Sequence, residues 1–368
     1  MAKVSDPRLV MLGPAAQAHG EVASIVELYR AQGLFKRWPV EYLATHGDGG
    51  VGRDASLVLD ALRRFVGLIW QERRVVVHMH VQARRGFWRD ALFMALTLAT
   101  RNPLILQLHG AGFERLSESA GAPGRLLLRW LLERAAYVVV PCEPLRAWVG
   151  SISRSSNVVC IPNPVAPGKP VEDRRPNLVL FMAELQSANG VFDLLDAVAA
   201  LRAAVPDVRL VCAGEGQRSA VRRHAQHLGI ADAVTFTGWV GPSGRRALLE
   251  SAAVFALPAY AGALPMSLLE AMAASVPAVV SPVGAVPEVV TDGVTGLLVA
   301  PGDRASLQRA LRKLLLDRAL GARIGAAARE SVGLRFDPER AVPRLEGVYA
   351  AVGVCALAVT PGRFATPA

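Results

Sequence analysis

The feature that most constrains this chain is a regular alternation of short strand-like runs with helix-like runs. Apolar, β-branched runs alternate with amphipathic stretches that have a helical period. Strands separated by helices pair in parallel, so the pattern predicts a parallel sheet covered by helices on both faces. The expected strands of the first half are Leu9–Leu12, Val40–Ala44, Val75–His80, Leu104–Leu108, Tyr137–Val140 and Val158–Ile161, and the expected helices are Glu21–Gln32, Asp54–Trp70, Trp88–Ala99, Arg125–Ala135 and Glu143–Val149.

A proline-rich segment, Pro162–Pro176, interrupts this alternation. It contains five prolines in fifteen residues, which continue neither a helix nor a central strand. We interpret it as an inter-domain linker. The predicted domains are therefore residues 1–166, a linker at 167–176, a second domain at 177–336, and a C-terminal helix at 337–358 that crosses back to the first domain.

The alternation resumes after the linker. Asp303 is a suitable N-cap for the helix that follows it. The expected strands are Leu178–Ala183, Val208–Ala213, Val234–Thr237, Val254–Leu257, Val279–Ser281 and Gly296–Val299, and the expected helices are Val191–Ala204, Ser219–Leu228, Ser243–Ala252, Met266–Ala274, Ser306–Asp317, Ala319–Val332 and Pro338–Val354. The predicted architecture is thus two doubly wound, Rossmann-like α/β domains. Ligands bind such sheets beyond the carboxyl ends of the strands, so the cleft between the domains is the expected site.

The charge balance restricts the partners. The net charge is +10, and nearly all of the excess is arginine, which suits nucleic acid, an anionic membrane or a phosphorylated substrate. We find no nucleic-acid module signature and no aromatic-basic stripe, so we expect no nucleic acid. The stretches Leu57–Arg74, Gly86–Thr100 and Gly124–Arg134 mix Arg, Trp and Leu, which suits a membrane surface. They equally suit ordinary amphipathic helices packed on a sheet.

The expected location is the cytoplasm, with peripheral contact at the inner face of the cytoplasmic membrane. No run reaches the ~18 consecutive apolar residues of a spanning helix, and the N-terminus leads directly into a strand instead of a signal peptide. The four cysteines are scattered without a CxxC pair, which indicates thiols in a reducing compartment with no metal site or disulfide framework.

The segment PAYAGALPMSLLE, residues 258–270, predicts an anion site at the start of a helix. Pro265 suits the first helical position, and the backbone N–H groups of Met266, Ser267 and Leu268 then face outward at the positive end of the dipole. Such a helix N-terminus suits a diphosphate. Glu270 follows one turn later, where its carboxylate can accept both hydroxyls of a ribose. The alternative is a buried amphipathic helix in which Glu270 has a structural role.

The segment Tyr260–Val299 closely resembles the donor-site region of the family-4, or group 1, glycosyltransferases of the GT-B fold. These enzymes use nucleotide sugars and retain the anomeric configuration. The resemblance extends over nearly the whole chain, in the same order along it. The further matching segments are Gly13-Pro14 with His19-Gly20, Gln107–Gly110, Val159–Pro164, Val211–Gly216 and Phe236–Gly238.

The resemblance implies roles for individual residues. His109 matches the residue at the transferred sugar and the reacting centre, and Glu270 matches the ribose-binding Glu. Residues 266–268 match the backbone donors to the phosphates. Gly20 matches a glycine that lets the first loop approach the donor phosphate, and Gly214 belongs to a second-domain landmark. There is no Asp-x-Asp arrangement, so we expect no metal and no cofactor, with the nucleotide sugar as substrate.

Three positions depart from the family pattern. Glu184 and Asn189 stand where the resemblance places the Arg and Lys that clamp the diphosphate, and Gly262 stands where it places a first Glu. Cationic contacts stabilise a departing diphosphate, so these replacements weaken an expected catalytic contribution. Lys169 and Arg218 are the candidates for a substitute cation.

Three functions follow from these observations. The main prediction is a retaining glycosyltransferase that moves a hexose from a nucleotide sugar to a lipid-linked or glycan acceptor in surface or exopolysaccharide synthesis. The second is a catalytically degenerate subunit that binds a partner glycosyltransferase. The third is a nucleotide-sugar epimerase, which can share this two-domain fold.

Overall fold

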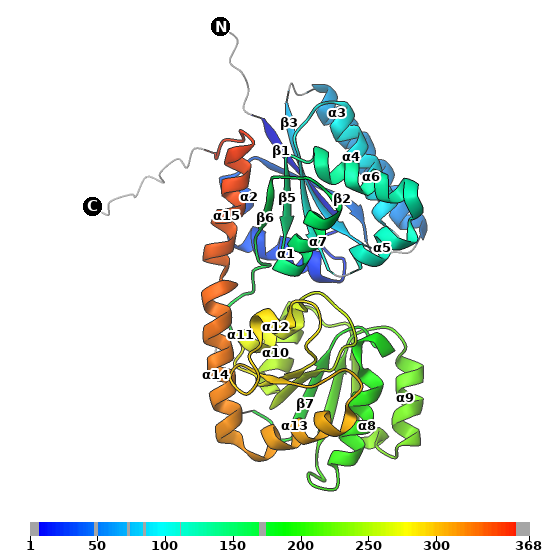
Figure 1. Ribbon diagram of the computed structural model, residues 1–368, viewed down its shortest axis with the longest axis vertical. Helices are drawn as coiled ribbons and strands as arrows, with labels where there is room; N and C mark the ends of the chain where they lie inside the picture. Colours follow the sequence, from blue (N-terminus) through cyan, green and yellow to red (C-terminus); the bar gives the residue numbers. More distant parts are fainter. Residues whose placement is uncertain are drawn as a thin grey trace, which may run out of the picture.

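The computed structural model describes residues 7–47, 51–71, 74–83, 86–110, 112–168 and 174–357. It consists of two lobes, one above the other in Figure 1, and each contains one six-stranded sheet. Every strand pair in both sheets is parallel. The predicted α/β architecture of two doubly wound sheets is confirmed.

The first lobe has the strand order β2-β1-β3-β4-β5-β6. The direction of winding reverses between β1 and β3, so the carboxyl ends of these two strands form a topological switch point. The elements of this lobe are β1 (Arg8–Pro14), α1 (Glu21–Ala31), α2 (Leu34–Arg37), β2 (Val40–His46), α3 (Val51–Gln71), β3 (Val75–Gln82), α4 (Phe87–Ala99), β4 (Leu104–His109), α5 (Phe113–Ser119), α6 (Gly121–Arg134), β5 (Tyr137–Val140), α7 (Glu143–Ile152) and β6 (Val158–Cys160).

Both faces of the first sheet are buried, as the continuous apolar strands require. In β1, Leu9 and Met11 pack against α1 and α15 (Pro338–Ala351) on one face. Val10 and Leu12 pack on the opposite face, in the core that α3, α4 and α6 cover. Successive side chains of a strand point to opposite faces, so an unbroken apolar run indicates a strand covered on both sides.

The second lobe has the strand order β12-β11-β10-β7-β8-β9, with its switch point between β7 and β10. The loops that follow these two strands therefore reach the same edge of the sheet. The elements are β7 (Leu178–Met182), η1 (Ser187–Asn189), α8 (Val191–Leu201), β8 (Arg209–Ala213), α9 (Arg218–His227), η2 (Ala231–Ala233), β9 (Val234–Gly238), α10 (Pro242–Ser251), β10 (Val254–Leu257), α11 (Met266–Ala273), β11 (Ala278–Val280), α12 (Val286–Val289), β12 (Leu297–Leu298), α13 (Arg304–Leu316) and α14 (Arg318–Arg335).

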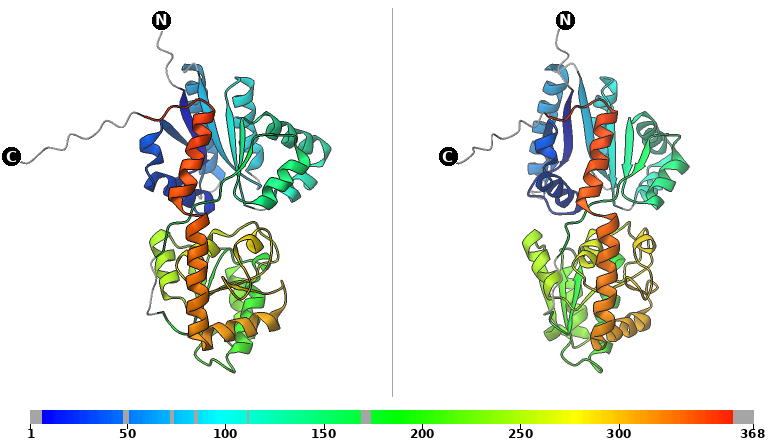
Figure 2. Two further views of the ribbon diagram at one scale, coloured as in Figure 1. Left: turned by 60° about the vertical axis from the view of Figure 1, so that its left-hand side comes forward. Right: turned by 90° about the vertical axis from the view of Figure 1, so that its left-hand side faces the viewer.

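Two consecutive helices, α14 and α15, run along one side of both lobes (Figures 1 and 2). Helix α14 packs on the second lobe, where Ile324 and Ala328 are buried in its core. Helix α15 returns to the first lobe, where Leu345 and Tyr349 are buried against the sheet. The last part of the chain therefore completes one face of the first sheet.

Each predicted strand and helix is present, with ends that differ by a few residues. Asp303 caps α13, because its side chain accepts a hydrogen bond from the Ser306 N–H. The sequence analysis missed α2, α5 and α12, which are too short to show a helical period. Lys169, one of the two candidates for a substitute cation, lies outside the described residues.

Candidate functional site

A cleft of about 760 Å³ lies between the two lobes, at the facing carboxyl ends of their strands. The first lobe contributes the loop after β1, the start of α1 and Gly110 after β4. The second lobe contributes the loops after β7, β8, β9, β10 and β11. The predicted site residues that line this cleft are Gly20, Glu184, Asn189, Gly214, Pro265, Met266, Ser267, Leu268 and Glu270.

The N-terminus of α11 faces this cleft and lies at Met266, where the predicted helix range begins, while Pro265 is the N-cap and not the first helical residue. The N-cap has an extended conformation. The Leu268 N–H donates to the Pro265 carbonyl at 3.1 Å, so the prediction of an outward-facing Leu268 N–H is wrong. Within the part of the chain that the structure describes, the Met266 and Ser267 N–H groups have no acceptor. Two amides and the dipole therefore remain for an anion.

Glu270 lies one turn into α11 and meets an arginine that the sequence analysis did not identify. Arg245 Nη2 is 3.4 Å from Glu270 Oε1, and both side chains are 18% exposed. Burial raises the pKa of the Glu270 carboxyl, and the positive charge of Arg245 opposes that rise. Arg245 Nη1 also donates a hydrogen bond to Ser24 Oγ at 3.1 Å. Arg245 therefore joins α10 to α11 and to helix α1 of the opposite lobe.

A regular pattern in the sequence could have pointed to Arg245. In α10, Arg245 precedes Leu248, Leu249 and Ala252 at the i, i+3, i+4, i+7 spacing of one helix face. Leu249 and Ala252 are buried in the second-lobe core. An arginine on the apolar face of a helix requires a polar environment at that end of the face, and here the cleft provides it.

The three departures from the family pattern all lie in the cleft. Asn189 Nδ2 donates to the backbone carbonyl of Glu184 at 2.8 Å, so the two residues belong to one local turn. Gly262 has open space around it, since a Cβ there would meet no atom within 4 Å. The cleft wall at Glu184 thus presents a carboxylate where the resemblance places a guanidinium.

Two glycines permit the close approach of the backbone in this cleft. Gly20 has a φ of 122°, and a Cβ there would have no neighbour within 4 Å, so its backbone is accessible to a ligand. Gly214 has a φ of 151°, and a Cβ there would lie 2.0 Å from the Ala183 carbonyl oxygen. Gly214 is therefore required for the close packing of the loops after β7 and β8.

His109 is not among the residues that line the cleft, although the neighbouring Gly110 is. His109 is buried, with 1% of its surface exposed, so its predicted place at the reacting centre stays a prediction. Its Nε2 is 2.8 Å from His80 Nδ1, and its buried Nδ1 has no hydrogen-bond partner among the described residues. Burial lowers the pKa of His109 to about 3, so this imidazole is neutral.

The histidines belong to a buried polar network at the centre of the first sheet. His78 Nδ1 is 2.7 Å from the Tyr349 hydroxyl of α15, and His78 Nε2 is 3.0 Å from Gln107 Oε1. Gln107 Nε2 donates in turn to the Tyr29 hydroxyl at 3.1 Å. Burial lowers the pKa of His78 to about 4. This network connects α1 and α15 to the strands beneath the cleft.

Arg218, the other candidate for a substitute cation, is not among the residues that line the cleft. Its guanidinium lies over the ring of Phe236, with Cζ 5.8 Å from the ring centroid, and Nη2 donates to the Phe236 carbonyl at 3.4 Å. The cleft instead carries a cross-lobe ring stack between His19 and Trp239, whose centroids are 3.8 Å apart. Across the described ranges, no three His, Cys, Asp or Glu side chains are arranged to hold a metal ion.

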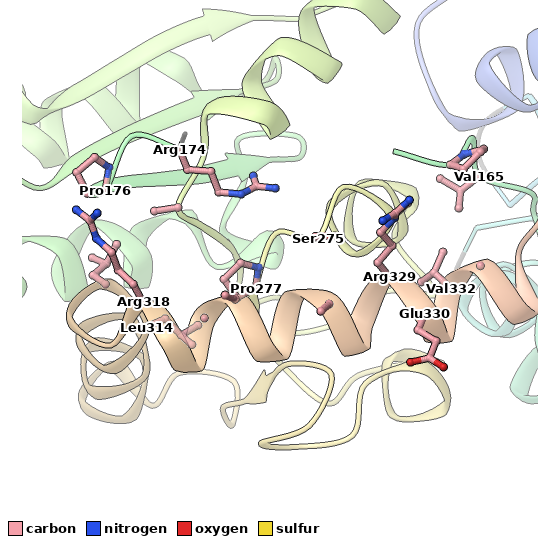
Figure 3. A pocket seen from close by; sticks show the side chains of 18 of the residues that line it. Val165, Arg174, Pro176, Ser275, Pro277, Leu314, Arg318, Arg329, Glu330 and Val332 are labelled. Atoms are coloured by element: carbon pink, nitrogen blue, oxygen red, sulfur yellow. The ribbon is translucent and has the colours of Figure 1, made fainter. Parts of the chain in front are cut away.

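A second pocket, of about 780 Å³, lies away from these residues (Figure 3). It lies between the end of the linker, the turn before β11 and helix α14. Arg174 there donates to the backbone carbonyls of Leu249, Ala252 and Ala274. Its guanidinium is thus committed to fixing the linker on the second lobe. The pocket brings together none of the predicted site residues, so the inter-lobe cleft is the candidate site.

Comparisons with known proteins agree with this fold. Residues 8–164 match the family described as "Glycosyl transferase 4-like domain", and residues 164–331 match "Glycosyl transferases group 1". A phosphatidyl-myo-inositol mannosyltransferase from Mycobacterium leprae is 34% identical over 206 residues, which are 54% of this chain and 54% of that protein. The chain spans about half the length of the curated relatives it matches.

Solved structures match the whole two-lobed arrangement. The sucrose-phosphate synthase of Thermosynechococcus elongatus has a TM-score of 0.75 at 20% identity, covering 94% of this chain and 99% of that one. Anabaena HepE in complex with UDP-glucose has a TM-score of 0.73 at 16% identity, covering 94% and 99%. The chain belongs to the group 1 glycosyltransferases and has the GT-B fold.

Proposed function

We propose that this group 1 glycosyltransferase transfers a hexose from a nucleotide sugar, with retention of configuration, to a lipid-linked or glycan acceptor in surface or exopolysaccharide synthesis. The observation that carries the proposal is the arrangement of α11 in the inter-lobe cleft. Two N-terminal amides face the cleft, and the carboxylate of Glu270 lies one turn behind them. That spacing suits a nucleoside diphosphate, with phosphate at the helix end and ribose at the carboxylate.

The described residues supply the main contacts that such a reaction needs. The Met266 and Ser267 N–H groups and the α11 dipole would hold the diphosphate and stabilise the charge that it gains as it leaves. Glu270 would accept the ribose hydroxyls. Closure of the two lobes would exclude water from the activated sugar. His109 is buried next to Gly110, which lines the cleft, and the resemblance to the family is the support for its place at the transferred sugar.

A surface on the first lobe supports a lipid-linked acceptor. Helices α3, α4 and α6 form one layer, since Phe65 of α3 packs edge-on against Phe93 of α4, and Trp88 of α4 lies against Gly124 of α6. The layer exposes large apolar side chains between arginines, an arrangement that favours an anionic bilayer surface. The exposed residues are Leu59 (69%), Val66 (41%), Trp70 (88%), Trp88 (49%), Leu92 (46%), Leu126 (68%) and Trp130 (38%).

Flotation with phosphatidylglycerol-containing vesicles tests this surface. None of the described helices has an apolar stretch long enough to span a bilayer. We expect binding at low salt that weakens at high salt and is lost in the double variant Trp70→Ser with Leu126→Ser. The control is Leu316→Ser with Leu334→Ser, two residues of the second lobe that are 58% and 55% exposed. Equal binding by both double variants would reject the assignment.

Transfer itself is tested with labelled nucleotide sugars and a membrane lipid extract. We expect a labelled lipid product, in which NMR shows the same anomeric configuration as in the donor. Absence of both transfer and nucleotide binding by folded protein would favour the alternative, a subunit that binds a partner glycosyltransferase. The presence of Glu184, Asn189 and Gly262 in the cleft is the observation behind that alternative. An epimerised sugar formed without an acceptor would indicate the third candidate, an epimerase.

A further inference from the structure

The charges that line the inter-lobe cleft are unusual for a site that binds a diphosphate. Four carboxylates line it, from Glu21, Glu184, Glu215 and Glu270. Among the lining residues that the structure describes, Arg245 is the one Lys or Arg. A diphosphate that enters this cleft adds further negative charge, so a neighbouring cation must offset the repulsion for it to bind.

We propose that Arg245 is the cationic contact for the donor's diphosphate and takes the place of the arginine and lysine that Glu184 and Asn189 replace. This inference rests on the proposed function, because it assigns a specific contact within the same donor site. Arg218 is not among the residues that line the cleft, and its guanidinium lies over the ring of Phe236. Lys169 lies outside the described residues.

The position of Arg245 relative to two helix ends supports this assignment. Its guanidinium contacts Ser24, the fourth residue of α1, and Glu270, the fifth residue of α11. Ser24 and Glu270 each lie about one helical turn from the N-terminus of their helix. Gly20 and Pro265, the N-caps of these helices, both line the cleft. An anion held between the two helix ends is thus within reach of the flexible arginine side chain.

Arg245 also retains hydrogen-bonding capacity for such a ligand. A guanidinium has five N–H donors in a fork that suits phosphate oxygens. Within the described ranges, Ser24 Oγ is the one acceptor of a hydrogen bond from this side chain. The 3.4 Å separation from Glu270 Oε1 exceeds the roughly 2.7–2.9 Å of a close charge-assisted bond. The pair with Glu270 is therefore loose enough for a phosphate oxygen to share the guanidinium.

The competing explanation is that Arg245 only neutralises the ribose-binding carboxylate. The two roles differ in how they depend on the phosphates of the ligand. If Arg245 binds the diphosphate, its loss weakens a nucleoside diphosphate and leaves the nucleoside almost unchanged. If Arg245 only neutralises Glu270, its loss weakens the binding of the nucleoside, the monophosphate and the diphosphate to the same extent, because all three carry the ribose.

Calorimetric titration of one nucleotide series separates these roles. The base comes from a panel of UDP, GDP and ADP, and the series is the nucleoside, its monophosphate and its diphosphate. For Arg245→Gln we expect a tenfold or greater loss of diphosphate affinity and less than a threefold change for the nucleoside, with Arg245→Lys between wild type and Gln. The matched control is Arg246→Gln, because Arg246 lies next in α10, outside the cleft, and pairs with Glu250 at 2.8 Å.

Each outcome decides between the explanations. Equal losses for the nucleoside and the diphosphate, or an unchanged diphosphate affinity, would overturn the role of Arg245 and leave the proposed transferase function intact. Failure of wild-type protein to bind any of the three diphosphates would overturn both. If Arg245→Gln does not fold, Arg245→Lys carries the test, with an expected loss that is larger for the diphosphate than for the nucleoside.

Discussion

Replacement of Glu270 by Gln tests whether the donor cleft recognises a ribose. Glu270 is only 18% exposed and lies on the cleft wall, one turn behind the two amide donors of α11. As a carboxylate it can accept hydrogen bonds from both ribose hydroxyls. Gln keeps the shape, but its Nε2 cannot accept, and its oxygen carries no charge.

The expected effect follows from the energies of these hydrogen bonds. A hydrogen bond to a charged group contributes about 1.5–3 kcal/mol and a neutral one about 0.5–1.5 kcal/mol. One bond that becomes neutral and one that is lost together cost about 2.5–4.5 kcal/mol, or about 70- to 2000-fold in affinity. Loss of the carboxylate also releases Arg245 from its 3.4 Å contact, which partly offsets the loss for a phosphorylated ligand. The estimate is therefore an upper bound for a nucleoside diphosphate.

A cycle with two ligands isolates the ribose contact. The affinities of wild type and Glu270→Gln are measured for a nucleoside diphosphate and for its 2′,3′-dideoxy analogue. Wild type should prefer the ribose form strongly, and the variant should lose most of that preference. Burial raises the pKa of Glu270, so the wild-type preference should also decline as the pH falls through that pKa and the carboxylate becomes protonated.

The control for this cycle is Glu215→Gln, which removes one carboxylate from the same cleft. It should leave the ribose preference unchanged and should strengthen diphosphate binding slightly, because repulsion falls. If Glu270→Gln discriminates the two ligands as strongly as wild type does, the ribose role of Glu270 is refuted.

Three further predictions concern the stability of the fold. Gly214→Ala places a Cβ 2.0 Å from a carbonyl oxygen at a φ of 151°, so strain of at least about 1–3 kcal/mol should destabilise the fold and lower its melting temperature. Gly262→Ala, where a Cβ meets open space, is the control and should leave the melting temperature unchanged. Equal melting temperatures for the two variants would contradict this prediction. Tyr349→Phe leaves His78 Nδ1 buried without its 2.7 Å partner and should cost about 1–3 kcal/mol in urea unfolding at pH 7, where an unchanged midpoint would count against the network. Burial raises the pKa of Asp90 from 3.8 to about 6, so the unfolding free energy of the wild type should fall as the pH rises through that range. The unfolding free energy of Asp90→Asn relative to wild type should therefore rise by about 3 kcal/mol between pH 4 and pH 7. A difference that stays constant over this range would rule the prediction out.

Much of the fold was predictable because it depends on local sequence patterns. The apolar runs at Leu9–Leu12 and Val254–Leu257 are short and β-branched or aliphatic, and helices separate them from the next strands, so parallel pairing was expected. Ligands bind beyond the carboxyl ends of such strands, which predicted the cleft, and the resemblance to the group 1 glycosyltransferases assigned Glu270 and Gly20 to it. Both residues do line it.

The sequence by itself therefore determined the two sheets, the position of the cleft and the helix end at Met266, since each follows from residues near one another in the chain. The tertiary structure decided which charged groups face the ligand. Arg245, Ser24 and Glu270 come from three helices in two lobes, and their meeting depends on how those lobes pack. The burial of His109 likewise depends on neighbouring strands, since it contacts His80 of β3. These contacts join residues that are far apart in the sequence, so the periodicity of the sequence does not predict them.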